Sequence, residues 1–403
     1  MPVDRIPRAA LVVALVLASC DGRGGTNSTP TSTDSTTLAA MALVASDQPD
    51  SPTNAYADDA DAAALGRLLF FDQRMSADGK VACASCHDPA HGFSDTKQVS
   101  QGVGGRQGAR HSMPATAVGF HPFLFWDGRA DSAWSQPLKA MEGPKEMDFS
   151  RVEVARFLGA EHRAAYEAIF GALPDLTALP ARAAPGLPAW DAMSATQQDE
   201  VNRVFANAGK AIEAYERKLV CADTRFDQYL RGEVTLTAAE SAGAADFVES
   251  GCTRCHNGPS FSDGKFHDLG LAGANDTGRA AGLVQLFADP FNGIGAYSDD
   301  KAAGAARLTI ASAETRTQDA FRTASLRGAG QRTSFGHRGD HATLRDFINE
   351  TYDRRRTGGG RNGNGNGNLD PLLDDVEPNN VDNVVAFLRT LDCPTPSADL
   401  LAP

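Results

Sequence analysis

Two Cys-x-x-Cys-His strings constrain this chain more than any other feature of its sequence. The first spans 83–87 and the second spans 252–256. Two thiols at i and i+3 can bond the two vinyl groups of one haem, and the next residue, His, is then placed to ligate the iron. A zinc or redox site is the alternative, but zinc needs four clustered ligands. The strings predict two covalently bound c-type haems, with thioether residues Cys83, Cys86, Cys252 and Cys255 and axial ligands His87 and His256.

An apolar run near the N-terminus is typical of an export signal. Arg5 and Arg8 precede the run 9–18, which is followed by a serine and Cys20. Positive residues, a short apolar run and small residues before a cut site form a secretory signal, and the run is too short to span a bilayer. We expect residues 1–19 to be a lipoprotein signal peptide and Cys20 to be lipidated. An ordinary signal peptide with an incidental Cys is the alternative. The mature protein is then periplasmic and membrane-anchored by its lipid only.

The two halves of the chain repeat one plan. A helix is predicted over 58–71 before the first string, and Thr237 opens a capping box before the second. Closing helices are predicted over about 200–220 and 381–391. We therefore expect a mainly α protein of two c-type cytochrome-like domains, each with one covalent haem, joined by long loops. We expect a flexible tether over 20–57, the two domains over 58–220 and 221–393, and a tail over 394–403. Long loops are expected over 101–114, 172–189 and 258–300, with a surface insertion over 358–368.

The overall charge of the chain excludes some partners. Lys and Arg number 38 against 51 Asp and Glu, which gives a net charge of −13. An acidic protein is a poor partner for nucleic acid or an anionic membrane surface. Neither is expected here.

Three of the seven cysteines lie outside the two strings. With Cys20 lipidated, Cys221 and Cys393 remain, one after each closing helix. An oxidising compartment and an even remainder predict a disulfide between them. Two unpaired buried thiols are the alternative.

The second half contains no methionine. The last of the seven Met residues is Met193. His/Met ligation of the second haem iron therefore cannot be built from local residues. The local candidates for the sixth iron position are Tyr229, Tyr297, Tyr352, His267, His337 and His341.

Six strings together resemble the bacterial dihaem cytochrome c peroxidase and MauG family. The resemblance covers about 60–393 and is carried by 65–72, 81–89, 125–138, 251–271, 321–328 and 387–391. Two further strings, DSAWSQ (131–136) and DPFNGIGAYSD (289–299), resemble the MbnH-type branch of MauG relatives. That branch implies a periplasmic copper-binding partner whose tryptophan is oxidised to kynurenine.

The resemblance implies roles for three residues around the first haem. Trp126 matches the tryptophan between the two haems, which could pass oxidising equivalents; a core aromatic is the alternative. Glu146 matches the distal glutamate, whose carboxylate can take a proton from hydrogen peroxide and return it. An ordinary surface position is the alternative for this residue. Gln136 matches a second polar group near that pocket.

The resemblance also assigns the second haem and a cation site. His337 matches the histidine of the family's PYxHxG string, and counting on from it reaches Thr351 and Tyr352. We take Tyr352 as the sixth ligand, where the peroxidases have Met and MauG has Tyr. A core or surface tyrosine is the alternative. The family's calcium site falls on His111, Arg332 and Ser334, and His in place of Asn at 111 disfavours calcium. The peroxidases' movable first-haem His has no counterpart in 92–110, so an open first iron is expected.

Three functions remain open on these grounds. The first is a MauG-like oxidase that uses hydrogen peroxide to oxidise a periplasmic partner protein. The second is a cytochrome c peroxidase that reduces hydrogen peroxide with electrons from a small cytochrome or cupredoxin. The third is an electron carrier without catalysis, which Glu146 argues against. Met at the second iron and a movable His at the first would favour the second function.

Overall fold

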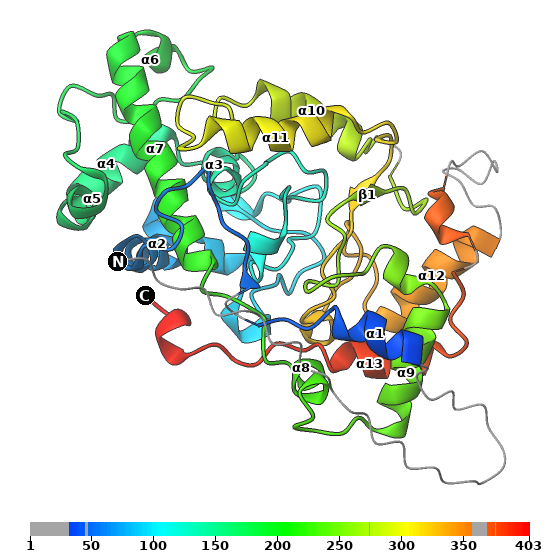
Figure 1. The fold of residues 1–403 in the computed structure, drawn as a ribbon. Coiled ribbons are helices and arrows are strands. Elements are labelled where there is room, and N and C mark those ends of the chain that lie inside the picture. Colours follow the sequence, from blue (N-terminus) through cyan, green and yellow to red (C-terminus); the bar gives the residue numbers. More distant parts are fainter. Residues whose placement is uncertain (1–31, 45–46, 274, 357–368, 375) are drawn as a thin grey trace, which may run out of the picture.

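The computed structural model describes residues 32–44, 47–273, 275–356, 369–374 and 376–403 (Figure 1). The expected signal peptide, Cys20 and the insertion 358–368 lie outside these residues. The fold is mainly helical, as predicted, and no helix in the described ranges is long and apolar enough to cross a membrane. The helices are α1 (Ser32–Ala39), α2 (Ala60–Phe71), α3 (Ser135–Glu142), α4 (Arg151–Glu161), α5 (Arg163–Phe170), α6 (Pro188–Asp191), α7 (Ala195–Glu216), α8 (Arg225–Leu230), α9 (Ala238–Glu249), α10 (Arg279–Ala288), α11 (Lys301–Ser312), α12 (Leu344–Arg356) and α13 (Val381–Arg389); β1 (Phe266–His267) and β2 (Phe321–Arg322) form one short antiparallel pair.

The first half is built on the crossing of α2 and α7. The side chain of Asp59 caps α2, and Ser194 opens α7 with a capping box. Gly66 lies at the crossing, where an added Cβ would be 1.8 Å from the carbonyl oxygen of Ala211. The two helix backbones are therefore in direct contact, and any larger residue at 66 would force them apart.

The second half repeats this crossing with α9 and α13. The predicted capping box is present, with Thr237 and Glu240 bonding each other's backbone N–H. A Cβ added at Gly243 would lie 1.8 Å from the carbonyl oxygen of Asn383, the same distance as between Gly66 and Ala211. The same glycine-mediated contact in both halves fits the two-domain arrangement predicted from the repeated plan.

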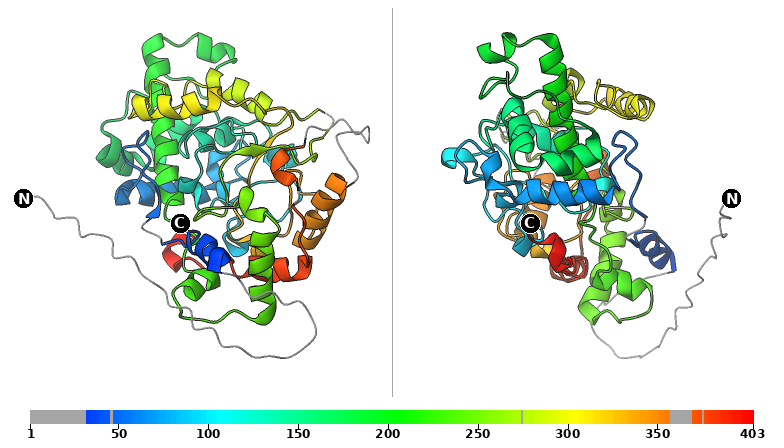
Figure 2. Two further views of the ribbon diagram at one scale, coloured as in Figure 1. Left: turned by 45° about the vertical axis from the view of Figure 1, so that its right-hand side comes forward. Right: turned by 90° about the vertical axis from the view of Figure 1, so that its left-hand side faces the viewer.

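Each half has its own apolar core. The first core is drawn mainly from 65–219, and the second from 226–391. A third cluster joins Phe123 and Phe266 to α10 and α11. The α10–α11 pair thus covers the first half although it follows the second attachment string in sequence (Figures 1 and 2).

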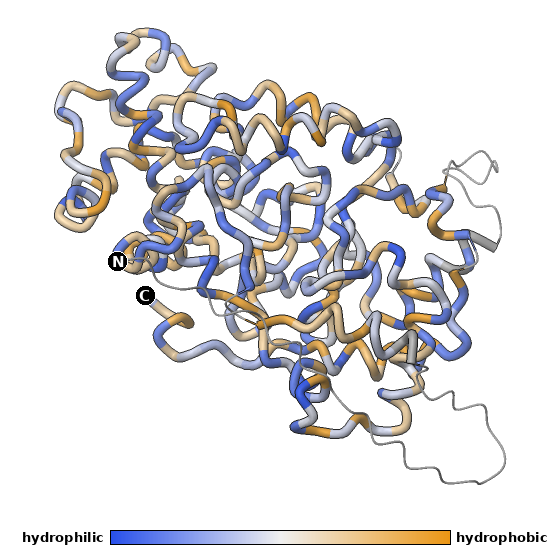
Figure 3. The backbone as a smooth tube through the Cα atoms, in the orientation of Figure 1, coloured by the Kyte–Doolittle hydropathy of each residue, from blue (hydrophilic) through white to orange (hydrophobic). Residues whose placement is uncertain are grey.

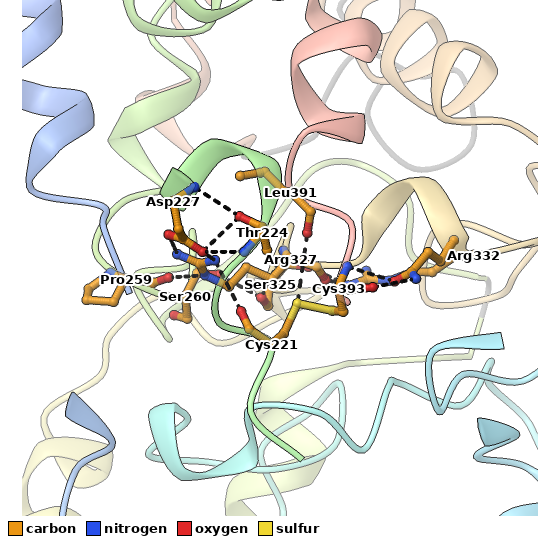
Figure 4. The surroundings of a disulfide bond; sticks show 11 residues. Cys221, Thr224, Asp227, Pro259, Ser260, Ser325, Arg327, Arg332, Leu391 and Cys393 are labelled. Carbon is orange, nitrogen blue, oxygen red and sulfur yellow. Dashed lines mark hydrogen bonds and ion pairs between the residues drawn. A yellow bond between two sulfur atoms is a disulfide. The ribbon is translucent and has the colours of Figure 1, made fainter. Parts of the chain in front are cut away.

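A disulfide links the two closing segments. Cys221 and Cys393 are bonded, as the cysteine count predicted. Beside them Arg327 and Asp227 form a buried ion pair, 1% and 2% exposed (Figure 4). Arg327 also donates to the carbonyl oxygen of Cys221, 3.1 Å away. The disulfide therefore lies at a cluster of polar contacts that ties 221–227 to the 325–332 segment.

Three segments differ from the sequence-based expectation. Part of the expected tether forms α1. Its Leu38 lies in the second core together with Met41, and Leu43, which follows them, is also buried. The expected loop 258–300 contains α10, and the expected loop 172–189 ends in α6. The expected tail returns to the first half, where the Arg67 guanidinium donates to backbone carbonyls at 399 and 402.

Candidate active site

The two attachment strings have the same local geometry. Each pair of cysteines brackets a single 3₁₀ turn, Cys83–Ser85 and Cys252–Arg254. In each, the histidine Nδ1 lies within hydrogen-bonding distance of a phenylalanine carbonyl oxygen: 3.3 Å for His87 and Phe93, and 3.0 Å for His256 and Phe261.

Both phenylalanines are buried and hold a positive φ, 57° at Phe93 and 51° at Phe261. This backbone turn aims the carbonyl oxygen back at the ring. A metal-binding histidine usually donates its second ring N–H in this way, which leaves Nε2 for the metal. Burial also lowers the pKa of His87 and His256, so both are neutral, the form that binds iron.

A cavity of ≈ 810 Å³ opens beside the first string. Cys83, Cys86 and His87 line it together with the three residues predicted for the peroxide pocket, Trp126, Gln136 and Glu146. These residues are spread over more than sixty positions of the sequence. Their convergence around one cavity next to an attachment string agrees with the predicted haem pocket.

Glu146 enters this cavity from the turn that follows α3. The N–H of Val103 donates to the carbonyl oxygen of Glu146 at 2.9 Å, and Gly143 accepts from the N–H of Glu146 at the same distance. Burial raises the pKa of the Glu146 carboxyl, and the charge of Arg129 opposes that rise only in part. A carboxyl with a raised pKa beside a reaction cavity is suited to exchanging protons near neutral pH.

Trp126 contacts both halves of the molecule. Its Nε1–H donates to the carbonyl oxygen of His111 at 2.8 Å, and its own carbonyl oxygen accepts from the N–H of Arg322 at 2.8 Å. Its ring lies 6.2 Å from that of His337, which stacks at 3.8 Å on Phe321. The indole therefore stands in the cavity wall and against the second half, and its place between two haems stays a prediction.

A buried basic cluster was not predicted from the sequence. Burial lowers the pKa of His121, and the positive charges of Arg322 and Arg332 lower it further. Burial also lowers the pKa of Arg322 to about 9 and of Arg332 to about 10. Within the described part of the chain, one nitrogen of each has no hydrogen-bond partner: His121 Nδ1, Arg322 Nη1 and Arg332 Nε. Buried donors of this kind require acceptors. The carboxylates of a haem supply anionic acceptors, so these nitrogens fit a haem bound near Trp126.

Glu216 is a second residue that the sequence did not reveal. It lines the same cavity from the end of α7. Burial, followed by the charge of Glu213, raises its pKa well above the ordinary value. The only sequence signal at Glu216 is the helix periodicity of α7. That periodicity does not distinguish a residue in a cavity wall from a residue on the protein surface.

The sixth position of the second iron stays a prediction. Tyr297 is excluded from it, because its ring packs in the first core and its hydroxyl bonds Asp199. Both ring nitrogens of His267 face carboxylates, and Thr351 bonds its own helix through Phe347. Tyr352 is in α12, but its side chain falls outside the described residues.

The positions matched to a calcium site do not form an acidic cage. His111 Nδ1 faces the carbonyl oxygens of residues 97 and 98, and the guanidinium of Arg332 donates to carbonyls at 325 and 327. Ser334, two residues after Arg332, is also buried. Among the described residues no group of three or more His, Cys, Asp or Glu could hold a metal ion.

A family model described as di-haem cytochrome c peroxidase matches residues 60–235. The chain is 29% identical over 350 residues to cytochrome-c peroxidase IdrP1 of Pseudomonas sp. (strain SCT), covering 83% of this chain and 81% of that protein. It is 31% identical over 218 residues to methylamine utilization protein MauG of Methylorubrum extorquens, covering 54% of this chain and 55% of that protein. The chain belongs to the dihaem cytochrome c peroxidase and MauG family. It is therefore a dihaem c-type oxidoreductase that acts on hydrogen peroxide.

Solved structures agree on the fold. A crystal structure of a MauG-like protein associated with microbial copper homeostasis is similar with a TM-score of 0.58 and 24% identity, covering 93% of this chain and 95% of that one. The likeness extends over both halves, which supports the two-domain arrangement.

Proposed function

We propose that this protein is a periplasmic enzyme that uses hydrogen peroxide to oxidise a partner protein, in the manner of MauG. The observation that carries the proposal is the cavity that brings Glu146, Gln136 and Trp126 together beside the first attachment string. Cys83 and Cys86 would hold the first haem and His87 its iron, while Cys252, Cys255 and His256 would hold the second. When bound, the haems supply the redox chemistry.

The residues of the chain provide the proton transfers. An oxygen of the Glu146 carboxylate would take a proton from one oxygen of hydrogen peroxide and return it to the other oxygen. Gln136 orients peroxide by hydrogen bonds from the start of α3. Because no histidine occurs in 92–110, peroxide reaches the cavity without displacing a ligand from that stretch.

Trp126 connects this chemistry to the second half. Its contacts with His111 and Arg322 hold the indole rigidly at the junction of the two domains. An indole can pass single electrons, so Trp126 shares oxidising equivalents between the two haems. A Tyr352 phenolate on the second iron would favour its higher oxidation states more than a thioether does.

The MbnH-type strings make a copper-binding exported protein, oxidised from Trp to kynurenine, the first candidate partner. A likeness to a MauG-like protein associated with microbial copper homeostasis accompanies them. The predicted signal peptide and lipid anchor would place the enzyme in the periplasm with such a partner.

Cytochrome c peroxidase activity is the second candidate function. The similarity to cytochrome-c peroxidase IdrP1 favours it, and that alignment covers more of this chain than the one to MauG. It requires a small cytochrome or cupredoxin as electron donor.

One experiment separates the two functions. The purified dihaem protein is treated with peroxide in the presence of the small exported protein encoded beside it, and separately with a reduced small cytochrome. A mass increase on a partner tryptophan supports the proposal. Rapid cytochrome oxidation without any partner modification would replace it with the peroxidase function.

A further inference from the structure

The helices α10 and α11 carry a concentration of exposed apolar side chains. Four of the seven large apolar residues that are exposed in the described chain lie between 284 and 310: Val284 is 73% exposed, Ile310 65%, Ile294 49% and Phe287 47%. Figure 3 shows these helices as a largely hydrophobic stretch of the tube. Val284 and Phe287 lie on α10, Ile310 lies on α11, and Ile294 lies in the loop that connects the two helices. We call the surface formed by these four residues the docking face.

The docking face follows the helix periodicity. Val284, Phe287 and Ala288 are spaced i, i+3 and i+4, so they share one side of α10. Ala306 and Ile310 share one side of α11 in the same way. Buried residues of both helices meet in one apolar cluster, which keeps the pair together.

The docking face is also almost free of charge. Among the exposed residues of these two fully described helices, Lys301 alone is charged. The whole chain is 22% charged with a net charge of −13. Exposed apolar area depleted of charge is typical of the centre of a protein interface.

Neighbouring sides of α10 belong to the candidate active site. Ala281 and Gln285, beside Val284 and Ala288 around the helix, line the cavity. Gly282 packs on the loop of Trp126, where an added Cβ would lie 2.1 Å from the carbonyl oxygen of Asp127. Arg279 donates to the carbonyl oxygen of Gly128 at 2.8 Å. One helix, about 10 Å thick, therefore separates the docking face from the Trp126 loop.

The size of the docking face selects among possible occupants. Helices of 10 and 12 residues side by side are about 15–18 Å long and together about 20 Å wide, which gives roughly 330 Å². A stable interface covers about 800 Å² per partner, and a permanent dimer needs more. The area thus suits a transient substrate complex. A membrane is a poor occupant, because α1, which follows the proposed lipidation site, lies at the other end of the molecule (Figures 1 and 2).

We propose that the docking face of α10 and α11 binds the protein substrate. This inference rests on the proposed function and adds its interaction surface. The substrate presents an oxidisable tryptophan or tyrosine within an uncharged, apolar surface of its own. The oxidising equivalents then reach it through α10 from the Trp126 loop, and electrons flow the opposite way, from the aromatic side chain to the enzyme that peroxide has oxidised.

Photo-crosslinking followed by binding tests the surface. The photoreactive residue p-benzoylphenylalanine is placed at position 284 of the full-length dihaem protein in cells, with position 44 as control because Val44 is also exposed, at 55%. The captured protein is then purified and mixed with the wild type and with the double variant Val284→Asp/Ile310→Asp. We expect capture at 284 and not at 44, and binding to the wild type that the double variant loses at least tenfold. Equal capture at both positions, or equal binding by both proteins, would overturn the inference.

The same double variant separates this inference from the proposed function. Haem content and the rate of the peroxide reaction should match the wild type, while KM for the captured protein rises at least tenfold. A matched variant, Val44→Asp/Leu372→Asp, should leave KM unchanged. A captured protein that binds at the docking face but is never modified would refute the proposed function and leave the surface in place. Modification at an unchanged rate by the double variant would refute the surface alone. If the wild type is a dimer that the double variant dissociates, the docking face binds a second copy and the inference is overturned. If the wild type binds vesicles and the double variant does not, the face binds lipid and the inference is likewise overturned.

Discussion

Replacing Asp227 by Asn should destabilise the second domain and release the N-terminal segment from it. The carboxylate of Asp227 accepts hydrogen bonds on both oxygens. Oδ1 accepts from Leu43 N at 3.1 Å and Arg327 Nη2 at 2.9 Å. Oδ2 accepts from Arg327 Nη1 at 2.8 Å and from the N–H and hydroxyl of Thr224 at 3.0 and 2.8 Å.

The size of the effect follows from this geometry. An asparagine has one acceptor oxygen, so its NH₂ group must face at least two of these donors. Arg327 also loses the only carboxylate that it pairs with in the described structure, and it is 1% exposed. Removing one partner of a buried ion pair costs about 3–5 kcal/mol, and the mismatched donors place Asp227→Asn in the upper half of that range. This is a large part of the roughly 5–15 kcal/mol that stabilises a domain.

The effect depends on pH with a defined sign. Burial raises the pKa of Asp227, but the hydrogen bonds and charge of Arg327 outweigh burial, so the folded-state pKa is lowered. The contribution of Asp227 is therefore complete above the unfolded carboxyl pKa of about 3.9 and is lost as pH falls through the lower folded value. The difference between wild type and Asp227→Asn should be constant near neutral pH and should shrink only in acid.

Two measurements on the dihaem protein check this prediction. Urea unfolding gives the stability difference, and hydrogen–deuterium exchange follows the amide of Leu43, which bonds Asp227 directly. Glu233→Gln is a matched control, since Glu233 is an exposed carboxylate paired with Arg231 close by in sequence. Unchanged exchange at Leu43 together with an unchanged urea midpoint in Asp227→Asn would refute the reasoning.

Four further predictions concern the haems and the cavity. Acid–acetone extraction should leave haem on both peptides that carry Cys83 and Cys252, as intact mass will show, and loss of either haem would contradict the attachment. Glu146→Gln should slow the peroxide reaction by about 10²–10⁴ in stopped-flow. In the wild type the raised pKa of Glu146 means that its base form is lost early as pH falls, so the reaction rate should decrease above the ordinary titration range of glutamate. Glu146→Gln should remove this decrease from the pH–rate profile. Trp126→Phe should keep both haems but abolish the spectral response of the second haem to peroxide, and an unchanged response would make Trp126 a core aromatic. Tyr352→Phe should change the absorption of the second haem, and an identical spectrum would remove Tyr352 as its ligand.

The attachment strings, the second capping box and the disulfide were predictable because each rests on a pattern that chemistry makes specific, whereas Trp126, Gln136 and Glu146 were assigned only by the family resemblance. Cys-x-x-Cys-His serves one prosthetic group, and Thr237 opens a capping box whose bonds are the ones observed. Even the disulfide followed from counting thiols, since Cys221 and Cys393 were the two left without another role.

The remaining features depend on contacts between distant segments. Arg322 looks like an ordinary surface cation in sequence, and only the fold shows that it is 4% exposed and held against the loop of Trp126. Leu38 and Met41 follow a Ser- and Thr-rich stretch that suggested a tether, yet the second core takes them in. In each case the deciding interaction is tertiary, so local composition and periodicity carry no trace of it.

The loop around Trp126 is the point where the functional parts of the molecule meet. The second half holds it through Arg322, and α10 holds it through Arg279 and the close contact at Gly282. A substrate on the outer face of α10 and peroxide in the cavity would therefore both act next to this short segment. Because α10 is fixed to this loop by backbone contact, a small displacement on docking would also move the indole relative to both haem sites. If the substrate docks as proposed, this arrangement would couple substrate binding to the supply of oxidising equivalents through one rigid connection rather than through the long loops of either domain.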